Sequence, residues 1–249
     1  MDNDLFPIIV KAGLMLVKSV GKTTVLRIFR HLILNQPDHV IERVFNSLGS
    51  GEEYNDKKLQ EGDTIRRDWY FENDNNLKFV ENMVRQIIED TQGKKSEYIT
   101  KFYVNIRFSS NDDIDEQTAF SYMEMMDSLS WRQLCIIKLL LLVKKAIVSS
   151  NRISEENIKN LPEDQRMAFH SISREYNELI QKGYISGNTA RPPWISDHKW
   201  HGEPQLEEFT SGWGVPYYLE RLHDLMNLHE IPKTEIIQTF PMWDIKFKS

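Results

Sequence analysis

The sequence predicts a mainly α-helical protein, built as a helical bundle with a C-terminal winged-helix-like module that carries a small β hairpin. Three observations predict this all-alpha class. Apolar residues recur at helical spacing through residues 79–106, a capping box begins a helix at residue 131, and the elements after residue 131 follow the order of a winged helix. An apolar fraction of 40% and a charged fraction of 27% over 249 residues are typical of chains that fold around a core.

The chain is expected to divide into three regions. Residues 1–48 should form amphipathic helices, and residues 49–77 should be a charged linker or loop. The linker is expected because two close glycines are followed by a dense mixture of charged side chains and Asn with few apolar anchors. Residues 78–249 should form the helical core, whose part from 131 to 228 is winged-helix-like.

The N-terminal region should contain a long helix or two in series over 5–34 and a short helix over 38–48, because apolar residues recur there close to every 3.6 positions. One stripe of the first helix carries three lysines: Lys11, Lys18 and Lys22. The apolar face is larger than this stripe can cover, so we expect the helix to pack against residues 79–149 or against a second copy of the chain.

The core should begin with three amphipathic helices, over 79–88, over 98–106 after a break at Gly93, and over about 115–128. The next helix start is the best-defined local signal. Ser130 and Gln133 form a capping box, flanked by leucines at the staple positions. The helix that follows, over 131–149, is apolar on almost every side, so it should be the buried central helix.

The C-terminal part has the element order of a winged-helix module. A short helix near 154–160 should precede a longer helix that ends at Gly183, a natural left-handed cap. Tyr184-Ile185 is a strand candidate at the start of an irregular hairpin over 184–213, and a final helix is expected over 215–228.

Cysteine usage and the apolar runs indicate a cytoplasmic protein. Cys135 is the only cysteine, so no intramolecular disulfide can form and a reducing compartment is expected. The chain starts Met1-Asp2-Asn3-Asp4, which is acidic where a secretory signal is basic. The longest apolar runs, 5–17 and 134–143, fall short of the ~20 residues that a transmembrane helix needs.

The sequence contains no local pattern of an enzyme, so neither a catalytic residue nor a cofactor is predicted. Gly21-Lys22-Thr23 resembles the end of a phosphate-binding loop, but Leu16 stands where that loop needs a glycine. No metal site is predicted either, because the C-terminal histidines lack the i, i+4 spacing of helical metal ligands: His198, His201, His223 and His229. An enzyme whose residues converge from distant positions stays open.

Charge distribution leaves only a local route to nucleic acid. The formal net charge is −6, acidic side chains predominate over 36–130, and both signs balance over 131–249. After residue 181 aromatic and basic side chains interleave, as in a nucleic-acid-binding wing and also, more commonly, as in a hairpin packed by its aromatic side chains. The candidate nucleic-acid-binding residues are Lys182, Arg191, Lys199 and His201.

Four stretches of the chain resemble the abortive-infection alpha (Abi-alpha) family of prokaryotic proteins, over about residues 79–232: Ser96 to Ile99, Leu129 to Leu134, Leu179 to Ile185 and Phe209 to Gly214. That family runs a helical segment into a serine-leucine-serine helix start and later enters its final helix through leucine-threonine-x-x-glycine. This chain departs from it by Trp213 and by a long segment over 187–208. The resemblance implies a link to phage defence and carries over no catalytic residue.

Together these features favour a non-enzymatic interaction protein, an adaptor or effector of a prokaryotic antiviral defence or stress response. Its expected partner is another protein or a second copy of the chain, because an amphipathic helix can dock into a partner's groove. The alternative is a winged-helix nucleic-acid-binding regulator.

Overall fold

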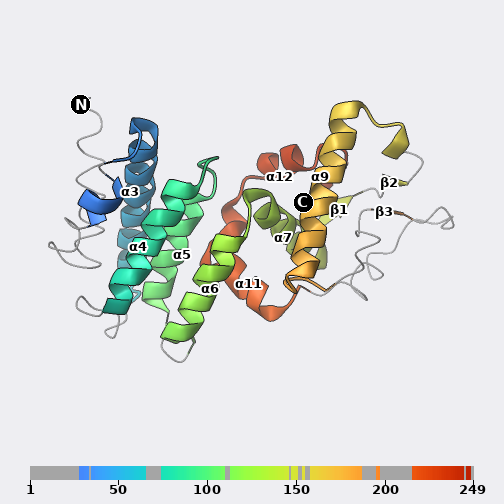
Figure 1. The fold of residues 1–249 in the computed structure, drawn as a ribbon. Helices are drawn as coiled ribbons and strands as arrows, with labels where there is room; N and C mark the ends of the chain where they lie inside the picture. Colours follow the sequence, from blue (N-terminus) through green and yellow to red (C-terminus); the bar gives the residue numbers. More distant parts are fainter. Residues whose placement is uncertain are drawn as a thin grey trace. The chain divides into compact units, whose positions relative to one another are not determined.

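The computed structural model describes residues 28–33, 35–65, 74–109, 113–145, 147–150, 153–154, 158–186, 195–196, 215–243 and 245–247. Its fold is mainly helical, as the sequence predicts (Figure 1). The chain divides into two compact units. Unit 1 contains Met1–Ser128 and Leu225–Asn227, and unit 2 contains Leu129–Asp224 and Leu228–Ser249.

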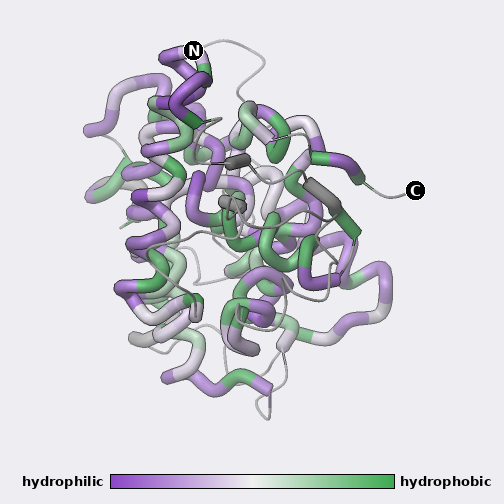
Figure 2. The backbone as a smooth tube through the Cα atoms, turned by 90° about the vertical axis from the view of Figure 1, so that its right-hand side faces the viewer, coloured by the Kyte–Doolittle hydropathy of each residue, from purple (hydrophilic) through white to green (hydrophobic). Residues whose placement is uncertain are grey.

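Unit 1 consists of helices in its described part. They are the π-helix η1 (Phe29–Ile33), α3 (Asp38–Gln60), α4 (Asp74–Glu89), α5 (Ser96–Phe108) and α6 (Glu116–Ser128). α3, α4 and α5 pack against one another (Figure 1). Ten of the thirteen residues of α5 are buried. Hydrophobic and hydrophilic segments alternate along the helices, as expected of elements that bury one face (Figure 2). The helices predicted from residue 79 to residue 128 are thus confirmed.

The linker predicted from residue 49 is wrong for residues 49–60, which continue α3 as a regular helix. Gly49 and Gly51 are buried on this helix, which packs closely on α5. Glycine in a helix costs roughly 0.5–1 kcal/mol relative to alanine, but its missing side chain lets two backbones approach. Burial of this part of α3 therefore outweighs the local signal for a break.

The loop between α4 and α5 is organised by side chains that satisfy helix ends. Arg43 on α3 donates from Nε to the carbonyl of Ile87 at 3.1 Å and from Nη2 to that of Ile88 at 2.8 Å, in the last turn of α4. A cation at a helix C-terminus is stabilised by the helix dipole as well as by these bonds. Arg43 therefore fixes the end of α4 to α3.

Asp90 and Lys95 continue this pattern across the first turn of α5 and the last turn of α6. The carboxylate of Asp90 accepts from the backbone N–H groups of Lys95 and Ser96, both at 2.9 Å. The buried ammonium of Lys95 donates to the carbonyl of Met126, near the C-terminus of α6. The anionic Asp90 thus caps the start of α5, and the cationic Lys95 binds the end of α6, as the helix dipole favours at each end.

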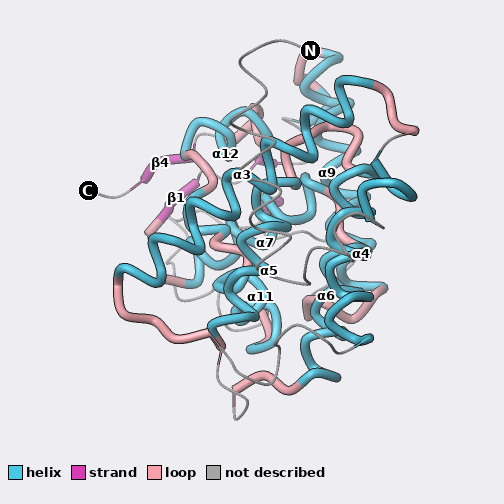
Figure 3. The backbone as a smooth tube through the Cα atoms, turned by 90° about the vertical axis from the view of Figure 1, so that its left-hand side faces the viewer, coloured by secondary structure: helices cyan, strands magenta, loops and turns pink. Residues whose placement is uncertain are grey.

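Unit 2 is built around α7 (Trp131–Lys144) and α9 (Glu163–Gln181). It also contains α11 (Tyr217–Leu225, whose last residue is assigned to unit 1), the 3₁₀ helix η3 (Leu228–Glu230) and α12 (Lys233–Thr239). Strand β1 (Val148–Ser150) pairs antiparallel with β4 (Ile245–Phe247), as Figure 3 shows. Strand β2 (Ile153–Ser154) pairs in parallel with β3 (Ile195–Ser196).

The capping box at the start of α7 is confirmed. The Ser130 side chain accepts from the backbone of Gln133, and the Gln133 side chain accepts from the backbone of Ser130. Leu129 and Leu134 are both buried, as staple residues should be. The predicted end at residue 149 is wrong, because α7 ends at Lys144 and Val148 already belongs to β1.

The cap at Gly183 is confirmed, and the strand predicted at Tyr184-Ile185 is wrong. Gly183 has φ +71°, its N–H donates to Ile180, and the Tyr184 N–H donates to Leu179, which is the Schellman motif. The backbone of Tyr184 is therefore used to end α9 and lies in a bend.

The winged-helix module and its hairpin are not shown. Of residues 184–213 the structure describes 184–186 and 195–196, and β3 pairs in parallel with β2, whereas a hairpin needs antiparallel neighbours. Most of the predicted helix over 5–34 lies outside the described residues; Ile28 and Ile33 within it are buried. No helix in the described residues is both long and apolar enough to cross a membrane.

Candidate functional site

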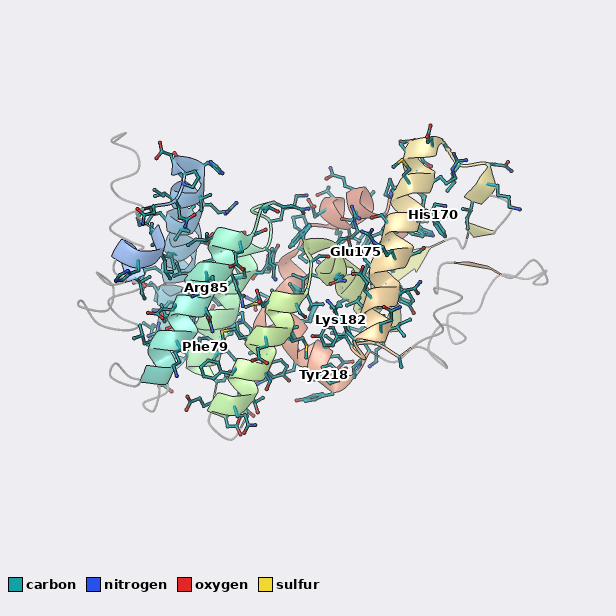
Figure 4. The ribbon with its side chains drawn as sticks, viewed as in Figure 1. Phe79, Arg85, His170, Glu175, Lys182 and Tyr218 are labelled. Carbon is teal, nitrogen blue, oxygen red and sulfur yellow. The ribbon has the colours of Figure 1, made fainter. Side chains whose placement is uncertain are left out.

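Of the four candidate nucleic-acid-binding residues, Arg191, Lys199 and His201 lie outside the described residues. Lys182 is exposed at the C-terminal cap of α9, and its Nζ lies 5.9 Å from the centroid of the Tyr184 ring (Figure 4). A cation at this distance from an aromatic face is a common contact at helix ends. The structure thus does not show the four residues together.

The side of α9 that faces away from the core carries a row of exposed side chains. We name this row the α9 stripe: Glu163, Met167, His170, Arg174 and Gln181. The opposite side is buried through Phe169, Ile172, Tyr176 and Leu179. Met167 is 66% exposed, which is unusual for a large apolar side chain on a well-packed helix. His170 is labelled in Figure 4 on this helix.

Polar contacts from α7 hold α9 in place behind the stripe. Arg132 donates to the hydroxyl of Ser171, and its Nη1 lies 3.4 Å from Oε1 of Glu175. Gln133 Nε2 donates to Glu178 at 3.0 Å. Each exposed pair is worth only about 0–1 kcal/mol, but together with the buried face they fix how α9 lies on α7.

α11 begins against the C-terminal end of α9. The hydroxyl of Tyr218 donates to the carbonyl of Gly183 at 2.6 Å, and burial raises the pKa of that hydroxyl, with Tyr184 adding to the shift. Lys144 on α7 binds Glu220, which holds the same end of α11. The neighbouring Tyr217, at the start of α11, is 76% exposed. Lys182 and Tyr218 are labelled in Figure 4.

A second polar group in unit 2 surrounds the turn after α11. The buried Lys138 of α7 donates from Nζ to the carbonyl of His229 at 3.0 Å and also to that of Ile231. Burial lowers the pKa of Lys138, and Cys135 opposes this. The ring of the buried His223 lies 6.3 Å from that of His229. Lys138 therefore fixes the backbone that carries His229.

Unit 1 contains a closed ring of hydrogen bonds between three side chains. Tyr54 donates from its hydroxyl to Oδ1 of Asn105 at 3.0 Å, Asn105 donates from Nδ2 to Oδ1 of Asn227 at 3.2 Å, and Asn227 donates from Nδ2 back to Tyr54 at 2.9 Å. Asn105 Nδ2 also donates to the carbonyl of Leu225 at 2.8 Å. This ring attaches residues 225–227 to unit 1.

Cys135, the only thiol of the chain, is fully buried in α7. No group of three or more His, Cys, Asp or Glu side chains within the described part could hold a metal ion. Among the described residues, Met167 and Tyr217 are the two most exposed large hydrophobic side chains. We name the α9 stripe together with Tyr217 the α9–Tyr217 surface.

The sequence analysis did not predict this surface, although the exposed position of Met167 follows from helical periodicity. Met167 lies two positions before Phe169, about 200° around the helix, so a helical wheel would have shown it to face away from Phe169, Ile172 and Tyr176. The place of Tyr217 beside the end of α9 depends on the bond between Tyr218 and Gly183, which are 35 positions apart. No local pattern reports such a contact.

No protein-family model, curated protein or solved structure matches this chain. The resemblance of residues 79–232 to the Abi-alpha family therefore stays a prediction.

Proposed function

We propose that the chain is a non-enzymatic interaction protein, an adaptor or effector that binds a protein partner through the α9–Tyr217 surface of unit 2. The observation that supports this most is the exposure of two large apolar side chains, Met167 at 66% and Tyr217 at 76%, on helices that hydrogen bonds fix to their neighbours. Methionine, tyrosine and arginine are the residue types enriched at protein interfaces, and the surface contains all three.

The dimensions of the surface suit one partner. Met167 and Gln181 are separated by about 21 Å of helix at 1.5 Å per residue, and Tyr217 lies just beyond the end of α9. A standard interface buries about 800 Å² on each partner, a patch roughly 30 Å across. Both apolar side chains therefore fit under one bound protein. A rigid helix presents them without the entropy loss of ordering a loop on binding.

The cellular setting that we propose is cytoplasmic, in a prokaryotic antiviral defence or stress response. This part rests on the resemblance to the Abi-alpha family and on the single cysteine.

Site-specific photocrosslinking in the native cell tests the interaction. A photoreactive amino acid replaces Met167 or Tyr217, and the same residue at Lys57, exposed on α3 of unit 1, is the matched control. We expect a protein captured from the first two positions and not from Lys57. The captured protein is then purified, and the Kd of its complex with the chain is measured. This Kd should rise at least 10-fold when the chain carries Tyr217→Ala or Met167→Glu. Equal Kd values for the variants and the unchanged chain would refute the proposed surface.

The second candidate is the winged-helix nucleic-acid-binding regulator. One observation favours it: β3 pairs with β2, so residues 195–196 lie beside the segment between α7 and α9, as a wing strand lies beside the strand that follows the first helix. One opposes it. Glu163 and Asp164 are exposed in the first turn of α9, and a recognition helix contacts bases with that end, where carboxylates repel phosphates.

A gel shift at several salt concentrations separates the two candidates. Binding that weakens with salt and with Arg191→Ala or Lys199→Ala would support the regulator. The interaction protein should give no shift at moderate salt.

A further inference from the structure

Met167 is more exposed than any other methionine in the part of the chain that the structure describes. It is 66% exposed, whereas Met125 and Met242 are partly buried. The remaining described methionines lie in the core and are at most 3% exposed: Met83, Met123, Met126 and Met226. Oxidation of a thioether by a soluble oxidant needs access to the sulfur. Such an oxidant therefore reaches Met167 before the other described methionines.

Oxidation at Met167 leaves the core of unit 2 intact. The opposite side of α9 is buried through Phe169 and Tyr176, and Gln133 on α7 donates to Glu178 of α9 at 3.0 Å. The Met167 side chain lies on the other side of the helix and takes no part in these contacts. A sulfoxide in the core would place a polar group among apolar side chains and would cost folding free energy. At Met167 the same change alters only the surface of a folded helix.

His170 gives the oxidised side chain a hydrogen-bond donor. It lies three positions after Met167 on the exposed side of α9, where it is labelled in Figure 4. Side chains three positions apart on a helix are neighbours, with about 5–6 Å between their Cβ atoms. The imidazole N–H can donate to the oxygen of a sulfoxide, whereas a thioether sulfur is only a weak acceptor. The surroundings of Met167 therefore accommodate its sulfoxide.

The oxidation transfers one oxygen atom from a hydroperoxide. An S–O bond forms at the thioether sulfur, and the O–O bond of the peroxide breaks. The sulfur loses two electrons, and hydrogen peroxide is reduced to water. Methionine sulfoxide reductases reverse the reaction: the S–O bond breaks, the oxygen leaves as water with two protons, and two thiols supply the two electrons as they form a disulfide. Neither direction needs a cofactor bound to this chain.

We propose that Met167 is a site of reversible oxidation by hydroperoxides and that its sulfoxide weakens the binding of the protein partner at the α9–Tyr217 surface. The second part of this proposal rests on the proposed function. Oxidation turns a flexible apolar side chain into a polar one, so the apolar contact of Met167 with the partner is lost. Tyr217, 76% exposed on α11, contains no sulfur and keeps its contact. Binding is therefore weakened and not abolished.

Peptide mapping of the full chain tests the first part. The chain is treated with hydrogen peroxide for increasing times, and mass spectrometry measures the sulfoxide at each methionine. Met167 should be oxidised faster than every other described methionine, while the circular dichroism of the folded protein stays unchanged. A rate at Met167 no higher than that at the partly buried Met125 or Met242 would overturn the proposal.

The Kd of the complex with the photocrosslinked partner tests the second part. It is measured for the untreated chain, for the oxidised chain, and for the oxidised chain after incubation with methionine sulfoxide reductases. Oxidation should raise the Kd about 10-fold, because a buried apolar contact is lost, and the reductases should restore it. Equal Kd values before and after oxidation would overturn this part.

Two variants locate the effect. In Met167→Leu, which cannot be oxidised at this position, the Kd should be the same before and after peroxide, whatever its starting value. Met125→Leu, a matched change at a partly buried methionine of α6 in unit 1, should respond to peroxide as the unchanged chain does. A response that persists in Met167→Leu would place the oxidised residue elsewhere and reject the proposal.

The same measurements separate this proposal from the proposed function. A Kd that rises with Met167→Glu but not with oxidation would leave the α9–Tyr217 surface as the binding site and overturn its regulation by oxidation. A Kd that neither change raises, or a failure to capture any partner, would refute the surface itself and the second part of this proposal with it.

Discussion

Asn105 on α5 donates to Asn227 at 3.2 Å, although the two residues are 122 positions apart in the sequence. Asn227 has φ +52°, the one non-glycine residue with positive φ in the described part, and its side chain closes the ring with Tyr54. Asparagine tolerates this conformation better than most residues. The ring therefore accounts both for the residue type at 227 and for the place of residues 225–227 in unit 1.

The first prediction concerns this ring. Asn105→Ala should lower the free energy of unfolding of unit 1 by about 1–3 kcal/mol, because the half-buried Tyr54 and the buried Asn227 each lose a hydrogen bond. Asn227→Gly keeps the positive φ and removes the side chain. Urea denaturation of the two single variants and the double variant should show a coupling of about 0.5–3 kcal/mol. Strictly additive effects would mean that the ring does not act as a unit.

The second prediction concerns the pH dependence of stability. Burial lowers the pKa of His223 below its ordinary value; the hydrogen bond and the charge of Asp224 raise it, and Lys145 and His229 lower it. The unfolded chain then binds a proton more readily than the folded one, so His223 reduces stability as pH falls through about 6.5. Between pH 8 and pH 5, chemical denaturation should show a smaller loss of unfolding free energy in His223→Gln than in the unchanged protein. Equal losses would contradict the role of this histidine.

The third prediction concerns the end of α9. Gly183 has φ +71°, and the position that an added Cβ would take is open space, so Gly183→Ala should cost roughly 1 kcal/mol through backbone strain alone. Gly183→Asn should cost less, because asparagine visits this conformation more readily. Chemical denaturation of both variants checks the order. An alanine variant as stable as the glycine form would show that the cap is not needed.

The fourth prediction concerns the N-terminal segment. Removing residues 1–35 removes Ile28 and Ile33, which are 1% and 0% exposed. The truncated protein should melt at a lower temperature, or a homo-oligomer should dissociate, because a large apolar area is lost in either case. Melting and sedimentation measured together decide this. An unchanged melting temperature with unchanged sedimentation would make the segment a free docking arm.

Local signals in the sequence were sufficient for much of the helical framework. The start of α7 follows from Ser130 and Gln133, which need only each other, and the end of α9 follows from Gly183. The failures have one physical cause, which is that tertiary contacts override local preference. Gly49 and Gly51 resemble a break, but they are buried on α3, a helix that packs on α5. Val148 lies outside α7 and pairs with β4.

The candidate site was less accessible to sequence reasoning than the fold. Tyr218 and Gly183 are 35 positions apart, so their contact leaves no pattern in a local window. Of the α9–Tyr217 surface, only the stripe on α9 can be derived from helical periodicity.

Hydrogen exchange of the chain with and without the captured partner tests whether that partner binds the α9–Tyr217 surface. If the partner binds the α9–Tyr217 surface, backbone amides over 163–182 and the first turn of α11 should exchange more slowly in the complex, while those of α3 and α4 should not change. Met167→Glu should remove this protection. Protection confined to unit 1, or unchanged exchange over α9 in a saturated complex, would mean that the partner does not bind the α9–Tyr217 surface.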